Sequence, residues 1–182
     1  MANRNNHYEA AFEAWLQQFQ VPYVAVDEAR RMALGGRTLK NLDFIVSGDV
    51  TQPGPTKWLI DVKGRQFPTA GNQYWRNWTT KDEIASLAHW EELFGPTAQA
   101  ILVFAYNIVG DLAPLPADEL FEFQQRLYGF VAVRLDHYAS LARTLSVRWD
   151  TVTVQAENFR AIARPVRELL GLPRRQAVGA GL

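Results

Sequence analysis

The fold is decided by two short segments, NLDFIV at residues 41–46 and WLIDVK at residues 58–63. Both segments are rich in apolar and β-branched residues, and a stretch rich in glycine and proline separates them. This pattern predicts two strands, over residues 39–46 and 58–63, that are joined by a turn. Because side chains alternate between the two faces of a strand, Asp61 and Lys63 share one face of the second strand.

The acidic residues of the two strands are predicted to face each other. A hairpin centred on Gln52 places Asp43 directly opposite Asp61, with their Cβ atoms about 5 Å apart. Two carboxylates in this arrangement repel each other, so we expect a cation between them. Lys63 is one candidate, and a hard divalent metal ion held by oxygen ligands is the better one.

The remaining pattern predicts a mixed β-sheet flanked by helices, which is an α/β fold. Residues 7–20 carry apolar side chains at spacings of three and four, typical of an amphipathic helix. Thr80 and Glu83 form a Thr-x-x-Glu capping box that opens a helix ending near Phe94, and this role accounts for Glu83. Further elements are expected in the order strand 23–26, strand 100–106, strand 128–134, helix 136–143, strand 149–154 and helix 157–170.

Length and composition fit one globular domain. The 182 residues include 48% hydrophobic and 21% charged side chains, close to the averages for globular domains. We predict a single domain over residues 1–172 and a flexible tail over residues 173–182. No apolar run reaches the roughly 18 residues of a membrane span, and the first residues contain no signal-peptide core. We therefore expect a cytoplasmic protein with no membrane partner.

Several classes of site are excluded by what the sequence lacks. With no cysteine, there is no thiol nucleophile, disulfide or cysteine-ligated metal, and the three histidines show no metal-ligand spacing. Dinucleotide enzymes, P-loop ATPases and serine hydrolases lose their support because their glycine-containing motifs are absent. A glycosidase could use Asp43 and Asp61, but it has no role for Lys63. The net charge of zero argues against a protein that coats DNA without specificity, yet it permits one basic groove.

The order of these elements and acids is that of a known group of enzymes. An acid on one strand, Asp43, followed on the next strand by Asp61-Val62-Lys63, resembles the PD-(D/E)XK nuclease superfamily, which has the restriction-endonuclease-like or Holliday-junction-resolvase-like fold. The helix-strand-strand-strand-helix-strand core of that superfamily is similar to the arrangement predicted over residues 7–106. The resemblance implies a restriction-endonuclease-like αβββαβ core with C-terminal β/α additions. The sequence has Leu42 at the position where a proline sometimes precedes the first acid in that superfamily, which tolerates this difference.

The resemblance also implies a role for each residue of the motif. Asp43, Asp61 and the backbone carbonyl of Val62 would coordinate Mg²⁺ or Mn²⁺, which would polarise the scissile phosphate and lower the pKa of a bound water. Lys63 would orient the attacking water or stabilise charge on the phosphate. Many members also carry a glutamate on the first helix, and here either Glu9 or Glu13 can fill that place.

Other residues are candidates for binding substrate. Arg37, Lys40 and Arg65 flank the motif and are candidates for phosphate contacts, although such residues also keep strand ends soluble. Trp75 and Arg76 lie in an aromatic segment that is a candidate for stacking on unpaired bases, although aromatic residues just before a helix more often serve packing. The expected partner is nucleic acid, DNA in the first place, and a homodimer is left open. The alternative function is a catalytically silent binding module for nucleic acid or protein on the same fold.

Overall fold

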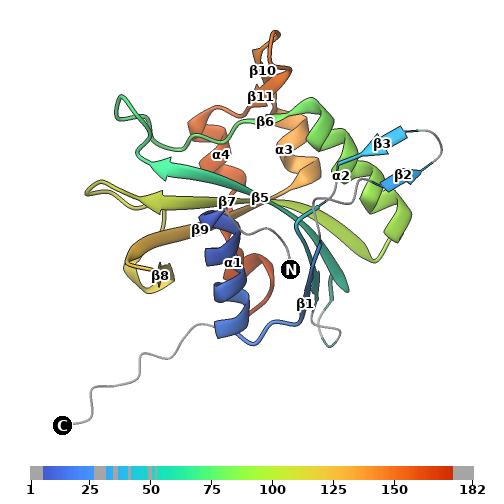
Figure 1. The fold of residues 1–182 in the computed structure, drawn as a ribbon, viewed down its shortest axis with the longest axis horizontal. Helices are drawn as coiled ribbons and strands as arrows, with labels where there is room; N and C mark the ends of the chain where they lie inside the picture. Colours follow the sequence, from blue (N-terminus) through green and yellow to red (C-terminus); the bar gives the residue numbers. More distant parts are fainter. Residues whose placement is uncertain are drawn as a thin grey trace.

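A mixed seven-stranded β-sheet forms the centre of the computed structural model, which describes residues 6–26, 32–34, 37–40, 42–48, 51 and 53–173 (Figure 1). The strand order is β1-β4-β5-β7-β9-β12, and β8 pairs with the first residues of β9, which β12 does not reach. The strands are β1 Tyr23–Ala25, β4 Phe44–Ser47, β5 Lys57–Phe67, β7 Ala98–Ile108, β8 Leu120–Phe123, β9 Arg126–Arg134 and β12 Arg164–Pro165.

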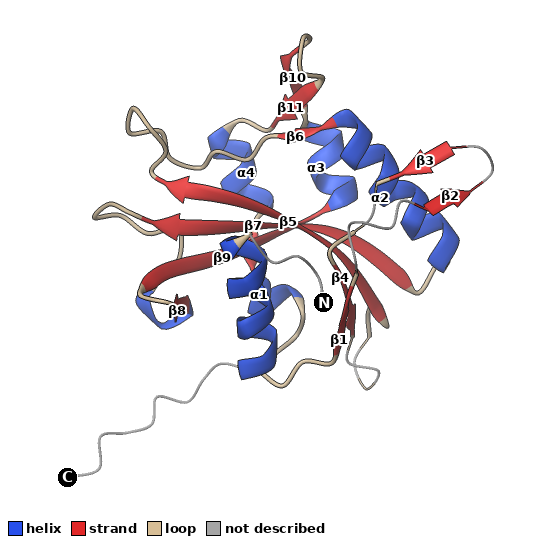
Figure 2. Cartoon of the chain, in the orientation of Figure 1, coloured by secondary structure: helices blue, strands red, loops and turns tan. Residues whose placement is uncertain are grey.

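Helices cover both faces of this sheet (Figure 2). The first helix, α1, and the short α5 pack on one face, whereas α2, α3 and α4 pack on the other. The bounds are α1 His7–Gln18, α2 Lys81–Phe94, α3 Leu135–Leu141, α4 Ala156–Ile162 and α5 Val166–Leu169, with a single 3₁₀ turn, η1, at Ala117–Glu119. Within the described ranges, no helix is long and apolar enough to cross a membrane.

Two small sheets lie outside the central one. β10 Arg143–Ser146, β11 Thr151–Thr153 and β6 Thr79–Thr80 form a three-stranded sheet next to the start of α2. β2 Met32–Leu34 and β3 Arg37–Leu39 form a hairpin inserted between β1 and β4. These additions leave the core order α1, β1, β4, β5, α2, β7 intact, so the αβββαβ core and the α/β fold class are confirmed.

The register of β4 on β5 is the one expected from the sequence. The two strands are antiparallel, with Phe44 opposite Ile60 and Val46 opposite Trp58. This register extends as far as Phe44, and there the pairing shifts by one residue, because the Asp43 N–H donates to the carbonyl of Ile60 at 2.9 Å. The alternate residues of β4 and β5 pack against α1, and Asp43 and Asp61 therefore belong to the opposite face, toward α2.

The parallel pairing of β5 with β7 is the longest in the sheet. Each of the 11 residues of β5 has a partner in β7, from Lys57 opposite Ala98 to Phe67 opposite Ile108. Nearly all of β7 is buried, as expected for a central strand that is covered on both faces and whose sequence is almost continuously apolar. The strand predicted over residues 100–106 is therefore confirmed and is longer at both ends.

Several predicted elements differ from those observed. The strand predicted over 39–46 is divided between β3 and β4, and the helix predicted over 157–170 is divided between α4 and α5. Pro165 causes the second division, because it has no N–H to donate to a helix and its ring clashes with the preceding turn. β2 and β8 were not predicted, and α3 gives way to β10 at Arg143. The predicted tail lies almost wholly outside the described residues.

A buried asparagine fixes the connection between β5 and α2. The Asn77 Nδ2 donates to the carbonyls of Trp75 at 3.0 Å and Val154 at 2.9 Å. Its Oδ1 accepts from the Val154 N–H at 2.8 Å and from the Thr153 hydroxyl at 3.0 Å. All its hydrogen-bonding capacity is satisfied, so the segment before α2 is held firmly to the segment that follows β11.

We expect Asn77→Ala to lower the free energy of unfolding by about 2–4 kcal/mol, because it leaves buried backbone groups of Trp75 and Val154 without partners. Urea denaturation followed by circular dichroism measures this change. Thr153→Val is the matched control, since it removes only one donor and is expected to cost about 1 kcal/mol or less. Equal costs for the two variants would contradict a central role for Asn77.

Candidate active site

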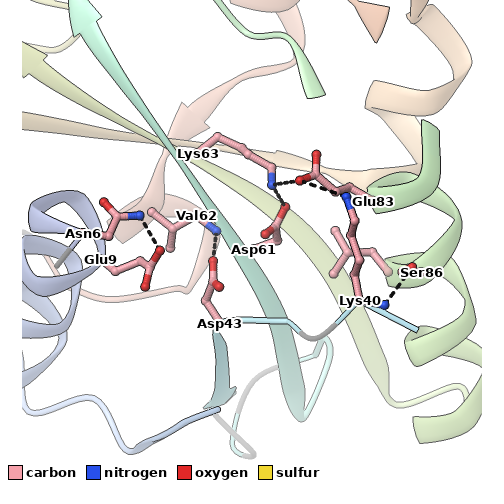
Figure 3. A pocket seen from close by; sticks show the side chains of 10 residues that line it. Asn6, Glu9, Lys40, Asp43, Asp61, Val62, Lys63, Glu83 and Ser86 are labelled. Carbon is pink, nitrogen blue, oxygen red and sulfur yellow. Dashed lines mark hydrogen bonds and ion pairs between the residues drawn. The ribbon is translucent and has the colours of Figure 1, made fainter. Parts of the chain in front are cut away.

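A polar pocket of about 390 Å³ opens where α1, β5 and α2 meet (Figure 3). It exists because β4 begins only at Phe44, and among the described residues no strand lies beside β5 on that side beyond Ile60. Side chains from both faces of the sheet therefore reach the same space. The lining residues are Asn6, Glu9, Lys40, Asp43, Asp61, Val62, Lys63, Glu83, Ser86 and Leu87.

Asp43 lies at the edge of the sheet, directly before β4. Its Oδ2 accepts a hydrogen bond from the Val62 N–H at 2.6 Å. Since the N–H and C=O groups of one residue in a strand point to the same side, the Val62 carbonyl is directed to this side of β5 as well. The Asp43 side chain is buried, and burial together with the negative charges of Asp61 and Glu9 raises its pKa well above the ordinary range.

Asp61 and Lys63 share the face of β5 that looks toward α2. The Lys63 Nζ lies 2.6 Å from the Asp61 Oδ2 and 3.0 Å from the Glu83 Oε1. Burial raises the pKa of Asp61, although Lys63 opposes this effect. Burial alone would lower the pKa of Lys63, but the carboxylates of Asp61 and Glu83 outweigh it and raise that pKa. Lys63 is therefore an ammonium ion held between two carboxylates.

Glu83 both caps α2 and holds Lys63. Its Oε2 accepts from the Thr79 hydroxyl at 2.6 Å and from the Thr80 N–H at 2.9 Å, and its own N–H donates to the Thr80 hydroxyl. Burial favours the neutral acid, but Lys63 and these hydrogen bonds lower the pKa of Glu83 to about 2. The capping box predicted from the sequence is confirmed. The contact with Lys63 was missed, because nothing in the local spacing brings the two residues together.

The first helix brings one of its two candidate glutamates to the pocket. Glu9 lines the pocket and accepts a hydrogen bond from the side chain of Asn6, the N-cap residue of α1. Glu13, one turn further along, is buried and accepts a hydrogen bond from the Tyr23 hydroxyl at 2.7 Å. Glu13 faces β1 and does not line the pocket, whereas Glu9 does.

The basic candidates for phosphate contacts lie in different surroundings. Lys40 lines the pocket, and its Nζ lies 3.6 Å from the Asp82 Oδ2. Arg65 does not line the pocket, because its guanidinium packs over the Trp78 ring at 4.0 Å from the centroid. It also donates to the carbonyls of Gly64 and Trp78. The side chain of Arg37 lies outside the described part of the structure.

The aromatic segment before α2 is used for packing. The Trp75 ring contacts the rings of Phe67, Tyr106 and Phe159 in edge-on or tilted geometry. The Arg76 guanidinium donates to the side chain of Gln73, and its carbonyl accepts from the Tyr106 hydroxyl at 2.9 Å. Neither Trp75 nor Arg76 lines the pocket.

The residues of the pocket fit a hard divalent cation. Their potential ligands are all oxygen atoms, the type that Mg²⁺ and Mn²⁺ prefer. Among the described residues, no three His, Asp or Glu side chains form a ready-made metal cage. Mg²⁺ requires no such cage, since it is usually bound by one or two carboxylates together with water and substrate phosphates. Asp43 and Asp61 supply two carboxylates whose ionisation is resisted by burial, and a cation would relieve that cost.

Comparison with known proteins supports the fold. No protein-family model matches the chain, and no curated protein matches its sequence. The crystal structure of Hjc from Archaeoglobus fulgidus, a Holliday junction resolvase from an archaeal hyperthermophile, is similar to it with a TM-score of 0.52 and 14% sequence identity. The match covers 92% of this chain and 100% of the resolvase chain. The chain therefore has a nuclease-like fold of the kind found in that resolvase, as expected from the sequence.

The raised pKa of Asp43 has a consequence for stability. In the unfolded chain Asp43 ionises near pH 4, whereas the folded protein resists this ionisation, so its contribution to stability falls as the pH rises from about 4 through the raised pKa. Asp43→Asn cannot ionise and still accepts from the Val62 N–H. We expect the metal-free variant to melt at a higher temperature than the parent at pH 7–8, with the difference shrinking toward pH 4. Thermal melts in EDTA across this range test it, and a variant that is less stable at pH 8 would contradict it.

Proposed function

We propose that this protein is a metal-dependent nuclease that hydrolyses phosphodiester bonds in DNA or structured nucleic acid. The observation that carries the proposal is the arrangement of Asp43, Asp61 and Lys63 on one face of the β4–β5 pair, in a polar pocket. The nuclease-like fold, similar to that of a Holliday junction resolvase, supports the same conclusion. Neither the fold nor the pocket would require three buried charges at this position for stability, because burying charge is costly unless every group is paired.

The acids of the pocket would hold the cation. Asp43, Asp61, the Val62 carbonyl and Glu9, directly or through water, would provide the oxygen ligands for Mg²⁺ or Mn²⁺. When bound, the cation would polarise the scissile phosphate and lower the pKa of the attacking water. Asp43 is kept in place by the Val62 N–H, and Glu9 by the side chain of Asn6.

Lys63 would act as a fixed positive charge beside the phosphate. Its ammonium group orients the attacking water or stabilises the charge that develops on the phosphate oxygens. Because Lys63 has two carboxylate partners, it remains anchored by Glu83 even when Asp61 is engaged elsewhere. We therefore assign Glu83 as a positioning residue for Lys63, and Lys40, at the rim, as a candidate phosphate contact.

A catalytically silent binding module on the same fold is the second candidate function. It is favoured by the ion pair between Lys63 and Asp61, which neutralises one of the two acids without any metal. The two functions differ in their response to metal. A nuclease should gain thermal stability with millimolar Mn²⁺ or Mg²⁺, since a ligand that binds only the folded state raises the melting temperature.

We expect Asp61→Asn to abolish this metal-dependent stabilisation and to lower cleavage roughly 100-fold or more, beyond the 10- to 100-fold cost of losing an outer-shell partner. The metal-free variant should be at least as stable as the parent, because a buried ionisable acid has been replaced by a neutral isostere. Cleavage is measured on single-stranded, duplex, branched and RNA substrates with Mg²⁺ or Mn²⁺.

The control for this experiment is Asp111→Asn, the same chemical change at an exposed position outside the pocket. It should retain both the metal response and cleavage. If Asp61→Asn loses stability while the metal response is unchanged, Asp61 is only a structural partner of Lys63 and the proposal fails.

Glu83→Gln tests the positioning role of Glu83. Glutamine preserves the capping box, so α2 should form normally, but Lys63 loses a carboxylate that raises its pKa. We expect cleavage to fall about 10- to 100-fold and the alkaline limb of the pH–rate profile to move to lower pH. Asp82→Asn, which alters the neighbouring exposed acid that pairs with Lys40, should leave the profile unchanged. A reduced rate with an unshifted profile would exclude the positioning role.

A further inference from the structure

The β10–β11 hairpin projects from the body of the protein beside the start of α2 (Figures 1 and 2). Its base is fixed, because Thr151 pairs with Thr80 and Val152 pairs with Thr79 in β6. Asn77 secures the same region through its hydrogen bonds to Val154. The hairpin is therefore a firmly anchored projection, and its tip is formed by residues 147–150 between the two strands.

Large apolar side chains at this tip and in the adjoining strand β10 are exposed to solvent. Val147 is 86% exposed, Trp149 67% and Leu145 49%. These are three of the eight large hydrophobic residues that are exposed in the described part of the chain, and they lie within five consecutive positions. Single exposed apolar residues are ordinary, but such a cluster marks a surface that binds something.

The charges around the tip favour a polyanionic partner. Arg143 and Arg148 are exposed, and the Arg148 guanidinium lies 5.1 Å from the centroid of the Trp149 ring. The acid of the hairpin, Asp150, is paired with the Lys81 Nζ at 3.3 Å. The hairpin thus combines an aromatic ring and one arginine at its tip with a second arginine, Arg143, at its base, and these are side chains that stack on bases and contact phosphates.

The tip is also close to the candidate active site along the chain. The Lys81 N–H donates to the Asp150 carbonyl at 3.0 Å. Lys81 is the first residue of α2, and Glu83, which holds Lys63 in the pocket, follows two residues later. The hairpin is therefore hydrogen-bonded to the same first turn of α2 that carries the pocket residue Glu83.

We propose that the β10–β11 hairpin is a nucleic-acid-binding element that recognises unstacked bases. Trp149 stacks on an exposed base, while Arg148 and Arg143 contact the adjoining phosphates. The inference rests on the proposed function for the class of ligand, and it adds the form of that ligand. An indole ring needs a free base face, which is available in single strands, at ends and at branch points, but not inside a continuous duplex.

Binding measurements on the cleavage-defective Asp61→Asn protein in EDTA test this inference without relying on catalysis. The probes are a labelled 20-nucleotide single strand, followed by fluorescence anisotropy, and an unlabelled covalently closed duplex circle as competitor. In this background Trp149→Ala should weaken single-strand binding about 5- to 100-fold, which is the effect of losing one base–aromatic stack. Trp149→Phe should retain most of the affinity for the single strand. The affinity for the closed duplex circle, measured by competition, should be nearly the same with and without Trp149→Ala.

Two further variants distinguish base stacking by Trp149 from the effect of a positive charge and from the general effect of removing an exposed apolar side chain. Arg148→Gln should reduce the dependence of log affinity on log salt concentration by about 0.7, the value for one phosphate contact on a single strand. Leu112→Ala removes an apolar side chain that is 59% exposed outside the hairpin and should bind as the parent does. All of these variants should melt like the parent, because the altered side chains are solvent-exposed.

The inference is overturned if Trp149→Ala binds the single strand as tightly as its parent. It is also overturned if Trp149→Ala changes the oligomeric state in solution while binding is unchanged, since the tip would then contact another protein chain. Loss of single-strand binding in Trp149→Ala would support nucleic-acid binding by the hairpin even if the parent protein cleaves no substrate. Cleavage by the natural chain with unchanged binding in Trp149→Ala would remove this inference alone.

Discussion

The ion pairs of Lys63 with Asp61 and Glu83 are the interactions on which the arrangement of the pocket depends. The ammonium group lies 2.6 Å from one carboxylate and 3.0 Å from the other, and it links the middle of the central sheet to the first turn of α2. Without it, Asp61 would be a buried carboxylate with no cation beside it, at a cost of several kcal/mol. The ammonium group of Lys63 thus offsets the cost of burying the Asp61 carboxylate in the sheet.

The negative charge of Asp43 is only weakly compensated by Lys63. Its carboxylate is buried near Asp61 and Glu9, and it accepts a hydrogen bond from the Val62 N–H. Such local destabilisation is typical of functional sites, whose residues are selected for chemistry and are tolerated because the rest of the fold supplies stability. Here that stability comes from the long parallel pairing of β5 with β7 and from apolar clusters on both faces of the sheet.

The start of α2 connects the site to the C-terminal part of the chain. Glu83 receives its hydrogen bonds from Thr79 and Thr80, and the same two residues form β6, which pairs with β11. The additions beyond the common core are therefore joined to the residue that positions Lys63. The β10–β11 hairpin is thus separated by one short strand, β6, from the first turn of α2, which carries the ion-pair partner of Lys63.

The sequence by itself determined the features that depend on local pattern. Alternation along the two strands and the position of the turn were sufficient to predict the register of β4 on β5, in which Phe44 lies opposite Ile60, because a strand register is fixed once one face is buried. The choice between Glu9 and Glu13 and the packing of Trp75 required the tertiary structure, as did the contact of Lys63 with Glu83 twenty residues away. These depend on how each helix or loop is rotated and seated against the sheet, which is decided by packing between segments distant in sequence and leaves no trace in local spacing.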